Sequence, residues 1–247
     1  MPSPLAATWL GRVGYLEGWR LQEAVASRAR GGGVDRLLLL EHDPVYTIGR
    51  RGTAANLTAS PSELRAIGAG VYRVDRGGDI TYHGPGQLVG YPVVSLGERP
   101  DLVGYVRALE DCLIDALATY GVRAQRVERK TGVWVELGPG RQAKIAAIGV
   151  RVSRGVTTHG FALNVSTDLA AFGRMIPCGF VHEVASLARL GIAADLREVG
   201  ERVAHALARR LGRELRWEAH VAPARDEEIA PDAPVRAAED LLADAIA

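Results

Sequence analysis

Three extended segments follow one another near the middle of the chain, joined by turns too short to contain a helix. The segments are expected over 132–137, 143–152 and 155–165, with turns at 138–140 and 153–155. Strands joined by turns this short must run antiparallel, because a parallel pair needs a crossover of a dozen or more residues. The fold therefore cannot be a strict alternation of parallel strands and helices.

Helical and extended patterns are interspersed along the rest of the chain. Helices are expected over 16–30, 101–120 and 197–211, and further strands over 36–41, 45–48, 71–75, 79–82 and 87–96. The strands over 71–75 and 79–82 flank Arg76-Gly77-Gly78 and are expected to pair as a hairpin. Together the patterns predict an α/β fold of the α+β type, a mixed and largely antiparallel sheet with helices packed on it.

The length of 247 residues suits one large core with an appendage. We expect a single domain over 1–220 and a mobile, acidic tail over 221–247. The tail is rich in Ala and Pro, with a short helix expected over 233–245. The net charge of +1 gives no broad field for nucleic acid or a membrane. No apolar run reaches the about 18 residues that span a bilayer, and no signal peptide is evident.

Lysine is rare in this chain, and one of its two lysines stands in an unusual place. Among 30 basic Lys and Arg side chains, the lysines are Lys130 and Lys144. Lys144 lies in the apolar stretch 142–149, where lost hydration is expected to lower its pKa. Arg cannot give up its proton under such conditions and Lys can. Lys144 therefore either moves protons or extends its ammonium to the surface.

The two cysteines have unlike surroundings. Cys112 falls on the apolar stripe of the helix expected over 101–120, which is typical of a small buried hydrophobe. Cys178 stands between Pro177 and Gly179, in a loop. A nearby amine or helix N-terminus would make it nucleophilic, and otherwise it is a buried loop cysteine. The pair gives no disulfide framework, and a reducing cytoplasm fits a free thiol.

A glycine-rich segment over 76–87 allows backbone to approach a ligand closely. It has neither the spacing of a phosphate loop nor that of a dinucleotide fingerprint. The six histidines show no metal-binding spacing, and His159 has the context of a structural histidine.

Four short motifs then occur in a fixed order. They are Arg-Gly-Gly-Asp-Ile-Thr-Tyr-His-Gly-Pro-Gly-Gln over 76–87, Lys-Ile-Ala-Ala-Ile-Gly over 144–149, His-Gly-Phe-Ala-Leu-Asn-Val over 159–165, and Ile-Pro-Cys-Gly over 176–179. With both candidate reactive residues inside them, these motifs make the chain resemble the lipoyl(octanoyl) transferases. The resemblance covers about 36–187.

The resemblance implies the fold of the biotin and lipoate protein ligase catalytic domains. It implies that Cys178 is the catalytic nucleophile, which carries an acyl thioester. Lys144 is its implied catalytic partner, lowering the thiol pKa and moving protons. The implied substrate-binding residues form three groups: Arg76, Gly77, Gly78, Asp79, Ile80, Thr81, Tyr82 and His83; Ala147, Ile148 and Gly149; and Gly160, Phe161 and Ala162.

The same resemblance implies the partners. An octanoyl group would pass from octanoyl-acyl carrier protein to a lysine on lipoyl domains of 2-oxo-acid dehydrogenases or of the glycine cleavage system, as the first step of protein lipoylation. We expect no cofactor, no metal, no nucleic acid and no membrane, and a cytoplasmic location.

Three other functions stay open. An ATP-dependent lipoate or biotin ligase would share the lysine, but would need an adenylate-binding loop and no nucleophilic cysteine. A cysteine hydrolase or thioesterase would pair Cys178 with His83 or His159 and release free acid. A non-catalytic acyl-binding module would use Cys178 and Lys144 only to line a pocket.

Overall fold

The computed structural model describes residues 4–176, 183–229 and 236–237. Its helices are α1 (Tyr15–Arg30), α2 (Pro61–Ala66), α3 (Leu102–Ala118) and α4 (Leu196–Leu211). The strands are β1 (Pro4–Val13), β2 (Asp35–His42), β3 (Val45–Ile48), β4 (Gly70–Arg73), β5 (Ile80–His83), β6 (Gln87–Val93), β7 (Ala124–Val127), β8 (Lys130–Gly138), β9 (Arg141–Ser153), β10 (Val156–Asn164), β11 (Glu183–Val184), β12 (Glu214–Trp217) and β13 (Arg236–Ala237). Short 3-10 helices lie at η1 (Ala54–Asn56), η2 (Leu169–Arg174), η4 (Ala188–Leu190) and η5 (Asp226–Glu228).

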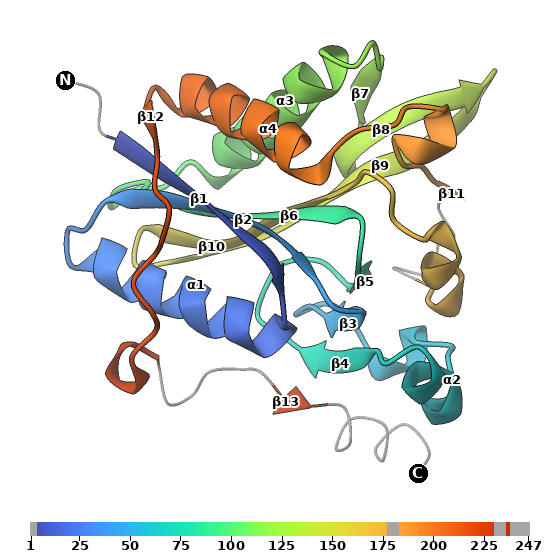
Figure 1. Ribbon diagram of the computed structural model, residues 1–247, viewed down its shortest axis with the longest axis horizontal. Coiled ribbons are helices and arrows are strands. Elements are labelled where there is room, and N and C mark those ends of the chain that lie inside the picture. Colours follow the sequence, from blue (N-terminus) through green and yellow to red (C-terminus); the bar gives the residue numbers. More distant parts are fainter. Residues whose placement is uncertain (1–3, 177–182, 230–235, 238–247) are drawn as a thin grey trace.

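One large sheet organises the domain. Within the described residues it has nine strands in the order β12-β1-β2-β6-β10-β9-β8-β7, with β11 beside β9. Neighbouring strands from β2 to β7 are antiparallel, whereas β12, β1 and β2 run parallel to one another and β11 runs parallel to β9. Helices α3 and α4 cover one face and α1 the other (Figure 1). The predicted mixed, largely antiparallel sheet with packed helices is confirmed.

The meander of β8, β9 and β10 forms where the two short turns predict it. The first turn joins Gly138 to Arg141, which face each other, and the second joins Ser153 to Val156. Gly140 and Gly155 both have positive φ, at +72° and +77°, a conformation that glycine adopts without strain. The turn glycines therefore fix the antiparallel register of the three central strands.

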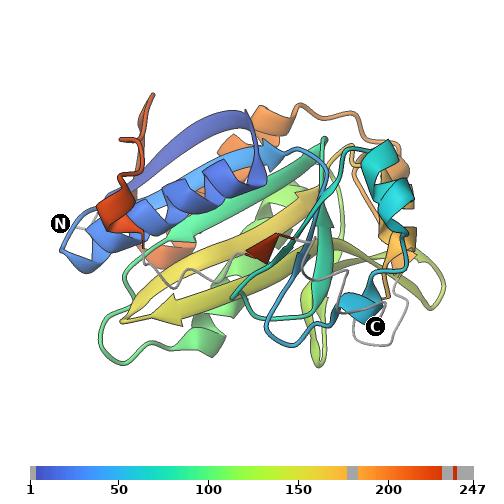
Figure 2. The ribbon, with the colours of Figure 1, turned by 90° about the horizontal axis from the view of Figure 1, so that it is seen from below.

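A small second sheet corrects one expectation. Its order is β13-β4-β3-β5, so β4 and β5 do not form the predicted hairpin. Both pair with β3, β4 in parallel and β5 antiparallel. The connecting segment does not close as a turn because it bonds to the residues after β3: Arg50 N–H donates to Arg76 O and Arg51 N–H to Gly78 O, each at 3.1 Å. The small sheet and α1 lie on the same face of the large sheet (Figure 2).

The described part of the tail contacts the domain. Arg28 of α1 donates to the carbonyl oxygens of Ala222 and Pro223 and pairs with Glu228 at 2.7 Å. Strand β13 pairs with β4, so the helix expected over 233–245 is wrong for Arg236 and Ala237, whose backbone bonds β4 instead. The division near 220 and the mobility of the tail stay predictions. Across the described ranges, no helix has the length and apolar character needed to cross a membrane.

Candidate active site

Lys144 lies on β9, directly across from Trp134 of β8. Its ammonium nitrogen lies 4.8 Å from the centroid of the Trp134 ring, within the range of a cation–π interaction. Trp134 is buried and Lys144 is half-buried. The charge of the lysine is therefore held against an aromatic face. Trp134 gives no signal in the sequence, because a tryptophan in a strand is equally typical of a core position.

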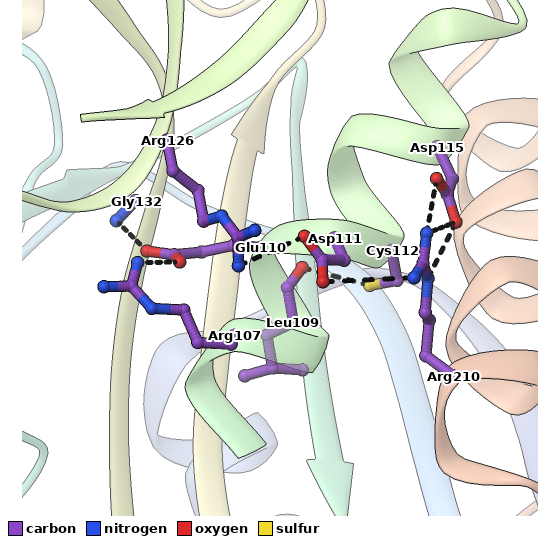
Figure 3. A network of polar contacts seen from close by, with 9 residues as sticks. All are labelled: Arg107, Leu109, Glu110, Asp111, Cys112, Asp115, Arg126, Gly132 and Arg210. Atoms are coloured by element: carbon purple, nitrogen blue, oxygen red, sulfur yellow. Dashed lines mark hydrogen bonds and ion pairs between the residues drawn. The ribbon is translucent and has the colours of Figure 1, made fainter. Parts of the chain in front are cut away.

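Gly132 keeps space open beside this lysine. Its φ is +118°, and a Cβ there would lie 2.6 Å from the carbonyl oxygen of Ala146 and 3.4 Å from Cε of Lys144. Its N–H donates at 3.1 Å to the carboxylate of Glu110, which is fully buried on α3 and also pairs with Arg107 (Figure 3). The backbone of β8 next to Lys144 is thus fixed from α3.

Cys178, the predicted nucleophile, lies outside the described residues, but both flanks of its segment are attached near predicted site residues. Before it, Ile176 N–H donates to the carbonyl of Asn56 at 2.8 Å. The side chain of Asn56 donates to Asp79 at 2.7 Å. After it, Val184 pairs with Lys144, and the N–H of the next residue donates to the Lys144 carbonyl at 2.9 Å. The chain after the cysteine therefore contacts the second predicted motif directly, and the chain before it is linked to the first through Asn56.

Arg76 is a buried cation that is used to hold the backbone. Its Nε and Nη2 donate to Oγ1 of Thr47 at 3.2 and 2.9 Å, and Nη2 also donates to the Thr47 carbonyl. Nη1 donates to the carbonyl of Gly77 at 3.0 Å. Burial lowers the pKa of this guanidinium, while nearby Tyr15 and Asp79 oppose that shift. Its donors therefore fix the glycine segment against β3.

The segment 77–79 touches β9 through its backbone. Gly77 N–H donates to the carbonyl of Val150 at 3.0 Å. A Cβ on Gly149 would lie 2.9 Å from the Gly77 carbonyl oxygen, so a side chain there would push the two segments apart. Gly78 has φ of +90°. The structure thus brings the first and second predicted substrate-binding groups together, as close backbone contacts.

Strand β5 carries the rest of the first group. Ile80 and Tyr82 are buried in a small core under α2, where the Tyr82 ring lies 5.1 Å from that of Tyr46. Thr81 is half-buried and faces Thr47 across the small sheet. The side chains of Ile80 and Tyr82 thus support the segment from behind.

The second and third groups lie side by side on β9 and β10. Gly149 faces Gly160, Ile148 faces Phe161, and Ala147 faces Ala162. The side chains of Ile148 and Phe161 pack in the core under α3 and α4. These two residues can therefore meet a ligand on the Gly77 side of the sheet only through their backbone.

His159 and Asp75 form a buried polar contact next to these groups. Nε2 of His159 lies 2.7 Å from a carboxylate oxygen of Asp75, whose other oxygen pairs with Arg151. Burial raises the pKa of Asp75, but His159 and Arg151 outweigh this and hold it below its ordinary value. The arrangement is that of a structural histidine.

Cys112 is fully buried on α3, and its thiol donates to the carbonyl of Leu109 (Figure 3). Burial raises its pKa well above the ordinary value. A thiol kept protonated is a poor nucleophile, which fits the predicted structural role. Over the described ranges, no group of three His, Cys, Asp or Glu side chains is arranged to hold a metal ion.

Known proteins resemble this chain in sequence and in fold. A family model described as the lipoyl protein ligase A/B catalytic domain matches residues 14–208. An octanoyltransferase of Solibacter usitatus is 51% identical over 202 residues, covering 81% of this chain and 90% of its relative. One of Mycobacterium tuberculosis is 50% identical over 201 residues, covering 80% and 83%.

The fold is that of solved lipoate protein ligases. A putative lipoate protein ligase from T. acidophilum with bound lipoic acid superposes with a TM-score of 0.72 at 19% identity, covering 92% of both chains. A lipoate-protein ligase A bound with ATP gives 0.71 at 19% identity, covering 92% and 91%. With the family model and relatives near 50% identity, the chain belongs to the octanoyltransferase family, built on the lipoyl protein ligase A/B catalytic domain, and it is an acyltransferase.

Proposed function

We propose that this protein moves an octanoyl group from octanoyl-acyl carrier protein to a lysine of lipoyl domains, through a thioester on Cys178. The acceptors are the lipoyl domains of 2-oxo-acid dehydrogenases and of the glycine cleavage system. The proposal is supported by the octanoyltransferase relatives. The one from Solibacter usitatus matches 81% of this chain. Its setting is the reducing cytoplasm, where a thiol stays free.

The first half-reaction exchanges one thioester for another. The thiolate of Cys178 attacks the acyl carbonyl, a new C–S bond forms, and the bond to the carrier thiol breaks. The leaving thiolate takes the proton that Cys178 gave up, by way of Lys144. A positively charged neighbour favours the thiolate, which is the nucleophilic form. No energy source is required, because one thioester replaces another.

The second half-reaction makes an amide. The lysine amine of the lipoyl domain attacks the acyl-Cys178 carbonyl, the C–N bond forms, and the C–S bond breaks to restore the thiolate. The attacking amine must lose a proton, and Lys144 is the residue proposed to accept it. Proton transfer by a positioned side chain typically contributes about 10²- to 10⁴-fold in rate.

The three predicted substrate-binding groups form the proposed walls of the acyl site. The backbone contact between Gly77 and Val150 joins two of them, and the facing pair Gly149 and Gly160 joins the third. Small residues at this junction let a ligand approach the backbone closely.

The observation that carries the proposal is the pairing of Val184 with Lys144, because it attaches the chain that follows Cys178 to the strand of its proposed partner. The test is the mass of the protein after incubation with octanoyl-acyl carrier protein. We expect one octanoyl adduct that hydroxylamine removes, that maps to Cys178, and that disappears in Cys178→Ala. The matched control, Cys112→Ala, should keep the adduct. An adduct on Cys112, or full turnover in Cys178→Ala, contradicts the proposal.

The competing activity is an ATP-dependent ligation of free octanoate or lipoate. The same assay is run with free acid, with and without ATP. Modification of the lipoyl domain that requires ATP and proceeds in Cys178→Ala would favour the ligase over the transferase.

A further inference from the structure

A line of buried polar side chains begins at Arg76 and crosses the small sheet. Arg76 donates twice to Oγ1 of Thr47, and Nε2 of His83 lies 3.5 Å from the same oxygen. On the other side of the ring, Nδ1 of His83 lies 2.8 Å from Oε1 of Gln87. All four side chains are buried.

The line continues through the large sheet to β11. Gln87 and Asn164 face each other on β6 and β10, and Nε2 of Gln87 donates to Oδ1 of Asn164 at 2.9 Å. Nδ2 of Asn164 donates to the carbonyl of Ala185 at 3.0 Å. Ala185 N–H in turn donates to the carbonyl of Lys144 at 2.9 Å. One continuous set of contacts therefore joins Arg76 to the backbone of Lys144.

Two backbone carbonyls fix the direction of every bond in this line. A carbonyl can only accept, so the side-chain nitrogen of Asn164 must face Ala185 and its oxygen must face Gln87. The nitrogen of Gln87 also donates to the carbonyl of Tyr82 at 3.2 Å, so its oxygen must face His83. His83 is thereby required to carry its proton on Nδ1.

The state of His83 agrees with this requirement. Burial, and after it the nearby His42 and Arg76, lower the pKa of His83 to about 3. The ring is therefore neutral at physiological pH, with a proton on Nδ1 and a bare Nε2 facing Thr47. The hydroxyl of Thr47, which accepts from Arg76, is free to direct its own proton toward Nε2. Every donor points from Arg76 toward β11, and removing one member leaves a buried partner unpaired.

We propose that Gln87 and Asn164 are positioning residues of the acyl-transfer site, which hold β11 and the backbone of Lys144 in place relative to the Arg76–His83 segment. The inference rests on the proposed function, since both ends of the line belong to the proposed site. It explains why Gln87 and Asn164, which lie 77 positions apart, are hydrogen-bonded to each other. Gln87 is the last residue of the first sequence motif, and Asn164 is the last but one residue of the third.

The test uses the nearly isosteric variants Asn164→Asp and Gln87→Glu. At neutral pH each new carboxylate lacks the N–H that the carbonyl of Ala185 or Tyr82 requires. We expect transfer of octanoate to a lipoyl domain to fall at least tenfold in each variant, with the protein still folded. A protonated carboxyl group regains one donor, so acidification should restore transfer relative to the parent at the same pH. Burial raises the pKa of a carboxyl group and brings this recovery into an accessible range.

The titratable group next to the carboxyl of Gln87→Glu is His83, on which the charges of His42, Arg76 and His159 act in turn, and Asn164 is separated from His83 by Gln87. Loss of activity through general damage would not be reversed by acid. The matched control is Thr157→Val, which removes a buried polar link between the same two strands at their other end: Oγ1 of Thr157 donates to Pro92 O at 2.7 Å and accepts from Val94 N–H at 2.9 Å. Transfer in this control should stay within about threefold of the parent at every pH.

A second measurement does not depend on activity. Hydrogen–deuterium exchange of the peptide over 183–190 should speed up in Asn164→Asp and Gln87→Glu and stay unchanged in Thr157→Val. Transfer within threefold of the parent at neutral pH, a loss that acid does not reverse, or unchanged exchange would each overturn the proposal. If the parent itself forms no acyl-enzyme, the proposed function fails, and the exchange measurement still decides whether the line holds β11.

Discussion

The ammonium nitrogen of Lys144 lies 4.8 Å from the centroid of the Trp134 ring. The other lysine of the chain, Lys130, lies 5.2 Å from the same centroid. The two nitrogens cannot be farther apart than these distances together allow, which is roughly 10 Å and about one Debye length at 0.1 M salt. The ring therefore attracts the charge of Lys144 while Lys130 repels it.

Two substitutions of Trp134 distinguish the effect of its aromatic face from the effect of its volume. Trp134→Leu removes the ring, and we expect octanoyl transfer to fall about tenfold, since a cation–π contact is worth about 1–2 kcal/mol when partly desolvated. Trp134→Phe keeps an aromatic face and should stay within a few-fold of the parent. Single-turnover transfer to a lipoyl domain measures both. Trp19→Leu, a buried tryptophan on α1, controls for lost packing. Equal losses in the Leu and Phe variants of Trp134 would show that the aromatic face makes no contribution.

Lys144→Arg keeps the charge and removes the proton transfer. Guanidinium stays protonated, so general acid–base help worth about 10²- to 10⁴-fold should be lost. The second half-reaction should slow more than the first, because its incoming amine must give up a proton, and acyl-enzyme should accumulate. Rapid-quench mass spectrometry resolves the two steps. Turnover within a few-fold of the parent would reduce Lys144 to a positive charge.

Gly78→Val should reduce acyl transfer strongly while the protein stays folded. Gly78 has φ of +90°, and a Cβ would lie 3.3 Å from Nη1 of Arg76. Gly97→Val is the matched control, because Gly97 has a similar φ of +79° but no atom within 4 Å of its Cβ position. Both variants carry the same backbone strain, so a comparable fall in melting temperature is expected. Equal transfer by the two variants would remove Gly78 from the site.

Stability should fall as the pH drops from about 6.5 toward 4. Burial lowers the pKa of His42 from 6.5 to about 4 and that of His83 to about 3. In this range the two histidines bind protons in the unfolded chain but not in the folded chain. The free energy of unfolding that is present above pH 6.5 is therefore lost on acidification, at about 1.4 kcal/mol per pH unit for each group. Glu23, whose pKa burial raises, acts in the opposite sense.

Urea unfolding at pH 7 and pH 5 measures this slope, and His42→Gln should flatten it. The control is His205→Gln, because His205 is exposed on α4. A slope that is the same in His42→Gln as in the parent would mean that His42 is not buried in its neutral form.

Local patterns in the sequence predict much of the fold, and contacts between distant strands explain where they fail. The helix α3 follows from its apolar stripe and from Asp101, whose side chain caps the helix by accepting from Gly104 N–H at 2.8 Å. The hairpin of β4 and β5 is wrong because β3, read correctly as a strand, lies between them. Strand β1 lies outside the predicted strands; one of its two parallel partners, β12, comes from the far end of the domain sequence, and the other, β2, follows β1 across α1.

The residues of the candidate site also fall into those that the sequence singles out and those that it does not. Lys144 stands out because nearly every other Lys or Arg position in the sequence is Arg. Trp134 and the pair Gln87 and Asn164 are ordinary residues by composition and spacing. Their proposed part in the site depends on which strands lie side by side, and no local pattern encodes that.

Because Cys112 is buried, it can serve as an internal reference for measuring how much of the enzyme carries the proposed acyl group. The thiol is fully enclosed and stays protonated at neutral pH, so Cys112 should resist an alkylating reagent in the folded protein, and the proposed nucleophile Cys178 is the other thiol of the chain. Denaturation exposes both thiols and supplies an internal standard within the same molecule. With Cys178 as the proposed acyl carrier, its labelling before denaturation divided by the labelling of Cys112 after denaturation reports the fraction of enzyme that carries no acyl group, without a radioactive substrate or a separate calibration.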